Sequence, residues 1–234
     1  MGRLVRIEPH KATDDEMLNC AITLSQRLVS SLPTTVDPAM SIAKIPFKVV
    51  SIREVLLHRA AELAEVSCAL FTQKRIVSAF MVTRGLLETA ALLCDLHGRV
   101  IRTADSSALD DLDGFLMQAL LGTREPDTKV RALNVLTIIK RVAKKMPFFL
   151  QSYDILSEFA HPNWSGGLAS YSKRDKGSPF VTNLGAEVAS VSPRVGLRVL
   201  VGTLEVFIFY YNDLGSRIPE FIRLCEDALA KKAT

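Results

Sequence analysis

Three polar side chains follow one another at helical spacing and could do chemistry together. Tyr153, Ser157 and His161 are each four residues apart, so on a helix they form a polar line beside the apolar side chains. An imidazole can act as a general acid or base near neutral pH, and hydroxyl groups can position a substrate or the imidazole. The alternative is a structural histidine that caps its helix by bonding the last carbonyl groups.

The segment after His161 is an unusual exit from a helix. Pro162 stops the helix, Asn163 can cap it locally, and the chain's single tryptophan, Trp164, comes next. The glycine pair at 166–167 then allows the backbone to approach another group closely. We therefore expect Asn163 and Trp164 to act as binding residues together with the hydroxyl groups of the preceding line.

A second candidate is a charged pair within an apolar helix. Arg84 and Glu88 lie one turn apart in a segment that is apolar on nearly every side. Charged side chains in such surroundings either compensate each other or line a polar cavity. The pair is thus either a structural ion pair between helices or part of a pocket in which Arg84 binds an anion. We expect the His161 imidazole to meet both residues, with Glu88 orienting the ring and Arg84 keeping the carboxylate ionised.

The elements that must position these residues follow from apolar periodicity, caps and breakers. The predicted helices span residues 13–31, 49–70, 74–97, 107–121, 126–145, 148–161, 194–214 and 217–231. Thr13 and Glu16 form a capping box at the start of the first helix. We expect Gly98 to end the third helix and Pro126 to lie in the first turn of the fifth helix. Weak alternation on both sides of the turn at 173–178 predicts a hairpin within residues 168–184.

These elements predict an all-α fold, an antiparallel helical bundle with a small β-hairpin insertion. We expect residues 1–48 to form an N-terminal helix and a proline-containing loop that pack on a helical domain spanning residues 49–234. The predicted hairpin tip carries Lys173, Arg174 and Lys176 close to Tyr171. Such a tip could contact nucleic acid, and the alternative is that it is simply solvated.

Composition excludes several classes of protein. Hydrophobic residues make up 48% of the 234 residues, which is enough for a packed core, and the net charge of +4 permits an anionic partner without demanding one. The four cysteines lie far apart without a CxxC pair, which favours buried, reduced thiols over zinc ligands or disulfides. We expect a cytoplasmic protein without a metal or cofactor.

The segment Val195 to Leu214 is nearly long enough to cross a bilayer. Arg198 and Glu205 interrupt it on one helical face, so we expect a core helix and no membrane span. Its aromatic residues are more than one domain usually buries, and they predict a homodimer that covers part of this surface. They are Phe207, Phe209, Tyr210 and Tyr211.

The segments RGLLETAA, from Arg84, and YDILSEFAHPNWSG, from Tyr153, resemble a group of bacterial proteins of unknown function associated with the HEPN superfamily. The resemblance covers about Val49 to Leu214 and implies an antiparallel helical bundle that often dimerises. Members of that superfamily are either metal-independent ribonucleases or non-catalytic binding modules. The nuclease signature has an arginine a few residues before the histidine, whereas here the positions 154–156 carry aspartate, isoleucine and leucine.

The sequence therefore favours a non-catalytic or regulatory HEPN-like module that binds RNA or a protein partner in a defence or stress system. One alternative is a metal-independent endoribonuclease in which His161 is the general acid and base and Arg84 stabilises charge on the phosphorane. In that case Tyr153 and Ser157 position the ribose or the imidazole. The other alternative is a sensor that binds a small anion in the Arg84 pocket.

Overall fold

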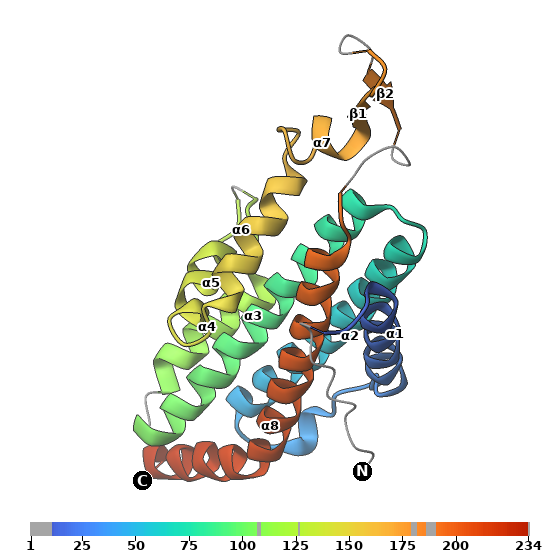
Figure 1. The fold of residues 1–234 in the computed structure, drawn as a ribbon. Coiled ribbons are helices and arrows are strands. Elements are labelled where there is room, and N and C mark those ends of the chain that lie inside the picture. Colours follow the sequence, from blue (N-terminus) through green and yellow to red (C-terminus); the bar gives the residue numbers. More distant parts are fainter. Residues whose placement is uncertain (1–10, 107–108, 126, 179–181, 186–190, 234) are drawn as a thin grey trace.

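The computed structural model describes residues 11–106, 109–125, 127–178, 182–185 and 191–233. It is an all-α bundle with a small two-stranded sheet, as the sequence predicts (Figure 1). The helices are α1 (Asp14–Ser30), α2 (Lys44–Thr72), α3 (Ile76–Ser106), α4 (Leu109–Leu121), α5 (Val135–Ala143), α6 (Phe148–Ala160), α7 (Leu168–Tyr171) and α8 (Arg194–Ala233), with a 3₁₀ turn at Pro38–Met40 and strands β1 (Ser172–Arg174) and β2 (Thr182–Leu184).

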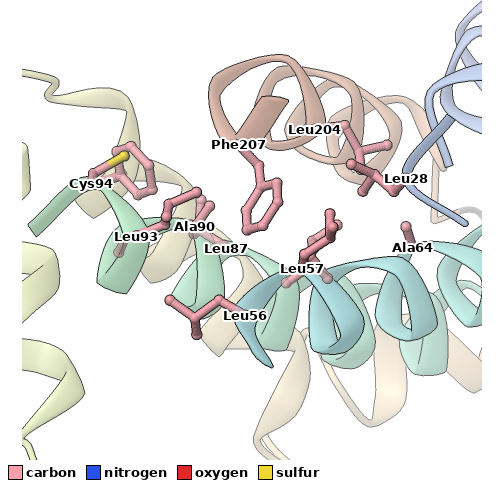
Figure 2. Close-up of a cluster of buried hydrophobic side chains, with 14 of the residues drawn as sticks. Leu28, Leu56, Leu57, Ala64, Leu87, Ala90, Leu93, Cys94, Leu204 and Phe207 are labelled. Atoms are coloured by element: carbon pink, nitrogen blue, oxygen red, sulfur yellow. The ribbon is translucent and has the colours of Figure 1, made fainter. Parts of the chain in front are cut away.

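Helix α3 is the centre of the bundle. It packs against α2 and α8 and also contacts α4, α5 and α6. The close-up in Figure 2 shows the Phe207 ring of α8 directed toward leucines of α2 and α3, among them Leu57 and Leu87. These three side chains are fully buried, so their removal from water contributes to the free energy that holds the helices together. Helix α1 packs on the outside of this layer against α2 and α8.

Three predicted helix ends are wrong, and packing explains one of them. Helix α2 begins at Lys44, not at residue 49, so Pro46 of the expected loop lies in the first turn of the helix, where its missing N–H costs no hydrogen bond. Helix α3 continues through Gly98 to Ser106, because Leu96 and Val100 on either side of the glycine are buried and continue the apolar face. Helix α5 begins only after Asn134, whose side chain accepts a hydrogen bond from the backbone N–H of Thr137. The prediction placed this start at Pro126, which lies outside the described residues.

Helix α8 is one continuous helix of 40 residues, so the prediction of two separate helices at its place is wrong. Pro219 lies inside it and has no backbone N–H for the carbonyl group of Gly215, one turn earlier. Figure 1 shows the C-terminal part of α8 turned across the end of the bundle. The proline therefore marks a bend, and the helix continues beyond it.

The hairpin prediction is confirmed, with one correction. Strands β1 and β2 pair antiparallel, with Lys173 opposite Asn183, whereas residues 168–171 form the short helix α7. Figure 1 shows α7, β1 and β2 extending beyond the end of the bundle. We call the described residues 161–178 and 182–185 the projecting arm.

Helices α3 and α8 are each long and apolar enough to cross a membrane by length and composition. However, 50% and 44% of their most apolar windows are buried among the other helices. Core helices of a bundle show the same combination, so the absence of a membrane span stays a prediction.

Candidate functional site

Arg84 is held by two partners, one on its own helix and one on α6. Its Nε donates to Glu88 Oε1 at 3.2 Å, and its Nη2 donates to the Tyr153 hydroxyl at 2.8 Å. The guanidinium carbon also lies 4.6 Å from the centre of the Tyr153 ring. The Arg84 and Glu88 side chains are about a quarter exposed, at 26% and 25%. The structure therefore brings three of the predicted site residues together in a half-buried cluster.

Apolar packing next to this cluster joins the same two helices. The rings of Phe80 on α3 and Phe159 on α6 meet edge to face with their centres 4.7 Å apart. Both polar and aromatic contacts thus connect α3 to α6. This arrangement is what a clasp between two helices needs, because Glu88 on α3 and Tyr153 on α6 both accept from the same guanidinium group.

The predicted meeting of His161 with Arg84 and Glu88 does not occur. The His161 side chain is exposed, and it makes no hydrogen bond or ion pair with either residue in the described chain. Its backbone N–H bonds the carbonyl oxygen of Ser157, and its extended backbone is what a residue before proline adopts. The Ser157 hydroxyl donates to the Tyr153 carbonyl oxygen at 2.6 Å, so it is used within its own helix.

Asn163 organises the loop after α6. Its side-chain nitrogen donates to Glu158 Oε2 at 2.8 Å, and its side-chain oxygen accepts from the N–H of Gly166 at 3.0 Å. A Cβ on Gly166 would lie 2.1 Å from the His161 carbonyl oxygen, so only glycine fits this turn. The loop closes on itself and leaves the Trp164 side chain 68% exposed.

The projecting arm combines exposed aromatic and cationic side chains. Tyr171 is 44% exposed and lies just before β1, which carries Lys173 and Arg174. These two cations and Lys176 are exposed or partly exposed, and the one carboxylate among them, Asp175, accepts a hydrogen bond from the N–H of Gly177. The arm that carries Trp164 and Tyr171 therefore has an excess of positive charge.

Sequence reasoning missed two cations near the base of the arm. Lys74 and Arg75, in the turn between α2 and α3, line a hollow of about 80 Å³ together with Ser170 and Tyr171. Lys74 has a positive φ of 57°, the left-handed conformation that reverses the chain after a helix. The pair of adjacent basic residues was the available signal, but the prediction placed both inside the helix 74–97, and only the fold places them beside the arm.

The predicted excess of apolar surface on α8 is smaller than expected. Phe207 is fully buried in the core, and Phe209, at 62%, is strongly exposed. Tyr211 is covered by Arg53, whose guanidinium carbon lies 3.6 Å from the centre of the ring. Its hydroxyl donates to Glu54, and burial with this contact raises the pKa of Tyr211 far above its ordinary value. The homodimer stays a prediction, and the exposed Phe209 ring is the aromatic surface that favours it.

All four cysteines are free, and Cys68, Cys94 and Cys225 are buried as predicted, whereas the prediction is wrong for Cys20, which is half-buried. Burial raises the pKa of the Cys68 and Cys225 thiols to about 11 and also raises that of Cys94. Within the described residues, no three histidine, cysteine, aspartate or glutamate side chains gather closely enough to hold a metal ion.

No family model, curated protein or solved structure matches the chain. The resemblance to the HEPN superfamily therefore rests on the sequence segments that carry it and stays a prediction. The geometry of the described residues is the basis for the function proposed below.

Proposed function

We propose that the protein is a non-catalytic, HEPN-like binding module that holds single-stranded RNA on its projecting arm. The observation that carries the proposal is the exposed Trp164 ring on the same arm as a group of cations. An indole ring that is 68% exposed keeps a large apolar surface in water, and a partner that covers the ring removes that surface from water.

The chemistry of the arm suits an unpaired strand. Bases in single-stranded RNA are free to stack on aromatic rings, and such stacking is worth about 1–3 kcal/mol per base. Trp164 and Tyr171 offer two rings, while Lys173, Arg174 and Lys176 can neutralise phosphates. Lys74 and Arg75 extend the positive surface from the arm onto the bundle.

The same geometry supports binding without cleavage. Phosphodiester cleavage needs a general base and a group that stabilises the developing negative charge close to it. Arg84 is bonded to Glu88 and Tyr153, and it makes no hydrogen bond to the exposed His161 ring. A histidine in this setting can stack on or bond to RNA, but the expected catalytic arginine, Arg84, is engaged by Glu88 and Tyr153.

Fluorescence anisotropy with a labelled oligouridylate of about twelve nucleotides tests the proposal. A variant in which Lys173, Arg174 and Lys176 become Gln should bind at least about tenfold more weakly and show a smaller dependence on salt. The matched control replaces Lys140, Lys144 and Lys145, which are exposed on and after α5, so it removes the same charge away from the arm.

Equal loss in both triple variants would show a general charge effect and overturn the arm as the binding element. No saturable binding by the native protein would overturn RNA as the ligand. Gel analysis of the same mixtures should show intact RNA, and cleavage that His161→Ala abolishes would replace the proposal with the endoribonuclease alternative.

A further inference from the structure

A buried carboxylate on α3 fixes two arginines where α3 packs against α5. The Asp95 side chain is only 3% exposed and accepts from Arg99 Nε at 2.9 Å. It also accepts from Arg141 Nη1, on α5, at 2.8 and 3.0 Å. Such a carboxylate orients both guanidinium groups before any ligand arrives.

The two arginines keep donors that the protein does not use. Each guanidinium has five N–H groups, and the bonds to Asp95 occupy Nε of Arg99 and Nη1 of Arg141. The remaining nitrogens of both groups have no hydrogen-bond partner among the described residues. The Arg99 guanidinium also lies 4.0 Å from the centre of the Phe115 ring, which helps to fix its position.

Both arginines line one groove between α4, α5 and the segment before α5. The groove has a volume of about 460 Å³, which is within the range of small-molecule sites. Its polar lining includes Gln118, Asn134 and Thr137. A Cβ built on Gly114 would meet nothing within 4 Å, so the α4 wall is open at this point.

The charges of the groove select the class of ligand. Asp110 and Asp111 at the start of α4 line it together with Arg99 and Arg141, so two carboxylates share it with two guanidinium groups. A phosphate-rich ligand would meet repulsion from the acids, and a simple cation would meet repulsion from the arginines. A small molecule with an oxyanion at one end and an ammonium group at the other can pair with the arginines and with the acids at the same time.

We propose that this groove binds a small dipolar ligand, of which a free α-amino acid is the simplest form. The ligand carboxylate accepts hydrogen bonds from the free N–H groups of Arg99 and Arg141, and the ligand ammonium group pairs with the two aspartates of α4. The site is separate from the projecting arm, and the proposal does not depend on RNA binding. The groove would give the protein a second binding site, which takes a small molecule.

The arginine Nε–H signals in ¹H–¹⁵N spectra of the full chain test this proposal. The probes are the common L-amino acids, each compared with its N-acetyl derivative and its amide, which lack one of the two charges. At least one amino acid should shift the Arg99 signal saturably. Its singly charged derivatives should bind about tenfold more weakly, because the loss of one charged contact worth about 1.4 kcal/mol weakens binding by that factor.

Arg141→Gln should weaken the same binding by at least about tenfold, since it removes contacts to the ligand while Arg99 still pairs with Asp95. Lys140→Gln, next to it on α5 but outside the groove, should leave binding unchanged. The proposal is overturned if no amino acid shifts the signal saturably, if the singly charged derivatives bind equally well, or if Arg141→Gln binds as the native protein does.

Discussion

The Arg84 guanidinium donates to the Tyr153 hydroxyl at 2.8 Å and so ties the central helix α3 to α6. The predicted site residues therefore lie in two different places. Arg84, Glu88 and Tyr153 form a clasp within the bundle, whereas His161 and Trp164 are exposed on the projecting arm. Predictions for the clasp concern stability, and predictions for the arm concern binding.

Tyr153→Phe should lower the free energy of unfolding by about 0.5–1.5 kcal/mol, because it removes one hydrogen bond and leaves the ring in place. Urea denaturation followed by circular dichroism measures this change. Tyr171→Phe is the control, since Tyr171 is exposed on the arm and its hydroxyl should contribute little. Equal stability of the Tyr153 variant and the native protein would mean that the clasp does not hold α3 to α6.

Gly196→Ala should destabilise the protein by about 1–3 kcal/mol through overpacking. A Cβ at this position on α8 would lie 2.1 Å from the fully buried Phe80 ring, which the neighbouring aromatic rings prevent from moving away. Gly114→Ala on α4 is the matched control, because a Cβ there meets nothing within 4 Å. It should raise stability by about 0.5–1 kcal/mol, as alanine favours the helix, and thermal denaturation of both variants should give shifts of opposite sign.

Much of the fold was predictable because its signals are local. The capping box at Thr13 and the apolar periodicity of α1 and α6 specify those helices within a few residues. Two of the misplaced ends lie at residues that locally signal a stop, Gly98 and Pro219. Burial of Leu96 and Val100 carries α3 through Gly98, and α8 continues through Pro219.

Contacts within the site were predictable only between residues whose spacing along one helix brings them together. Arg84 and Glu88 pair as their four-residue spacing requires, and the fold adds Tyr153 from another helix. The expected contact with His161 failed because the histidine lies two turns beyond Tyr153, at the end of α6. The groove around Arg141 depends on which helices become neighbours, and the sequence pattern does not contain that information.

The Asp213 carboxylate should stabilise the protein at neutral pH and lose this effect at acid pH. Hydrogen bonds from Arg217 and then from His97 hold the pKa of this carboxyl below its ordinary value of 3.8. A lowered pKa contributes stability that is present in full above the ordinary value and is lost as the pH falls through the folded-state value.

Melting temperatures of the native protein and Asp213→Asn between about pH 2 and pH 7 check this prediction. The variant should be less stable at neutral pH, and the difference should shrink as the pH falls below the ordinary carboxyl value. Asp227→Asn, on the exposed side of α8, should follow the native curve. A constant difference for Asp213→Asn across the whole range would contradict the prediction.

The cysteines should react in an order set by burial. Burial raises the thiol pKa of all four cysteines, so accessibility decides the order. Cys20 is half-buried, whereas Cys68, Cys94 and Cys225 are buried. A thiol reagent should label Cys20 first and the other three only as the protein unfolds. Peptide mass spectrometry during labelling identifies the sites, and early labelling of Cys94 would mean that the core around α3 is open.

The affinity of Trp164→Ala for a labelled oligouridylate, measured by anisotropy, tests the central claim most directly. We expect a loss of about 5- to 150-fold, the factor that corresponds to about 1–3 kcal/mol of base stacking, with no change in melting temperature. Phe209→Ala, which removes a similarly exposed aromatic ring from α8, should bind as the native protein does. Unchanged affinity in Trp164→Ala, or an equal loss in both variants, would contradict the assignment of the projecting arm as the RNA-binding element.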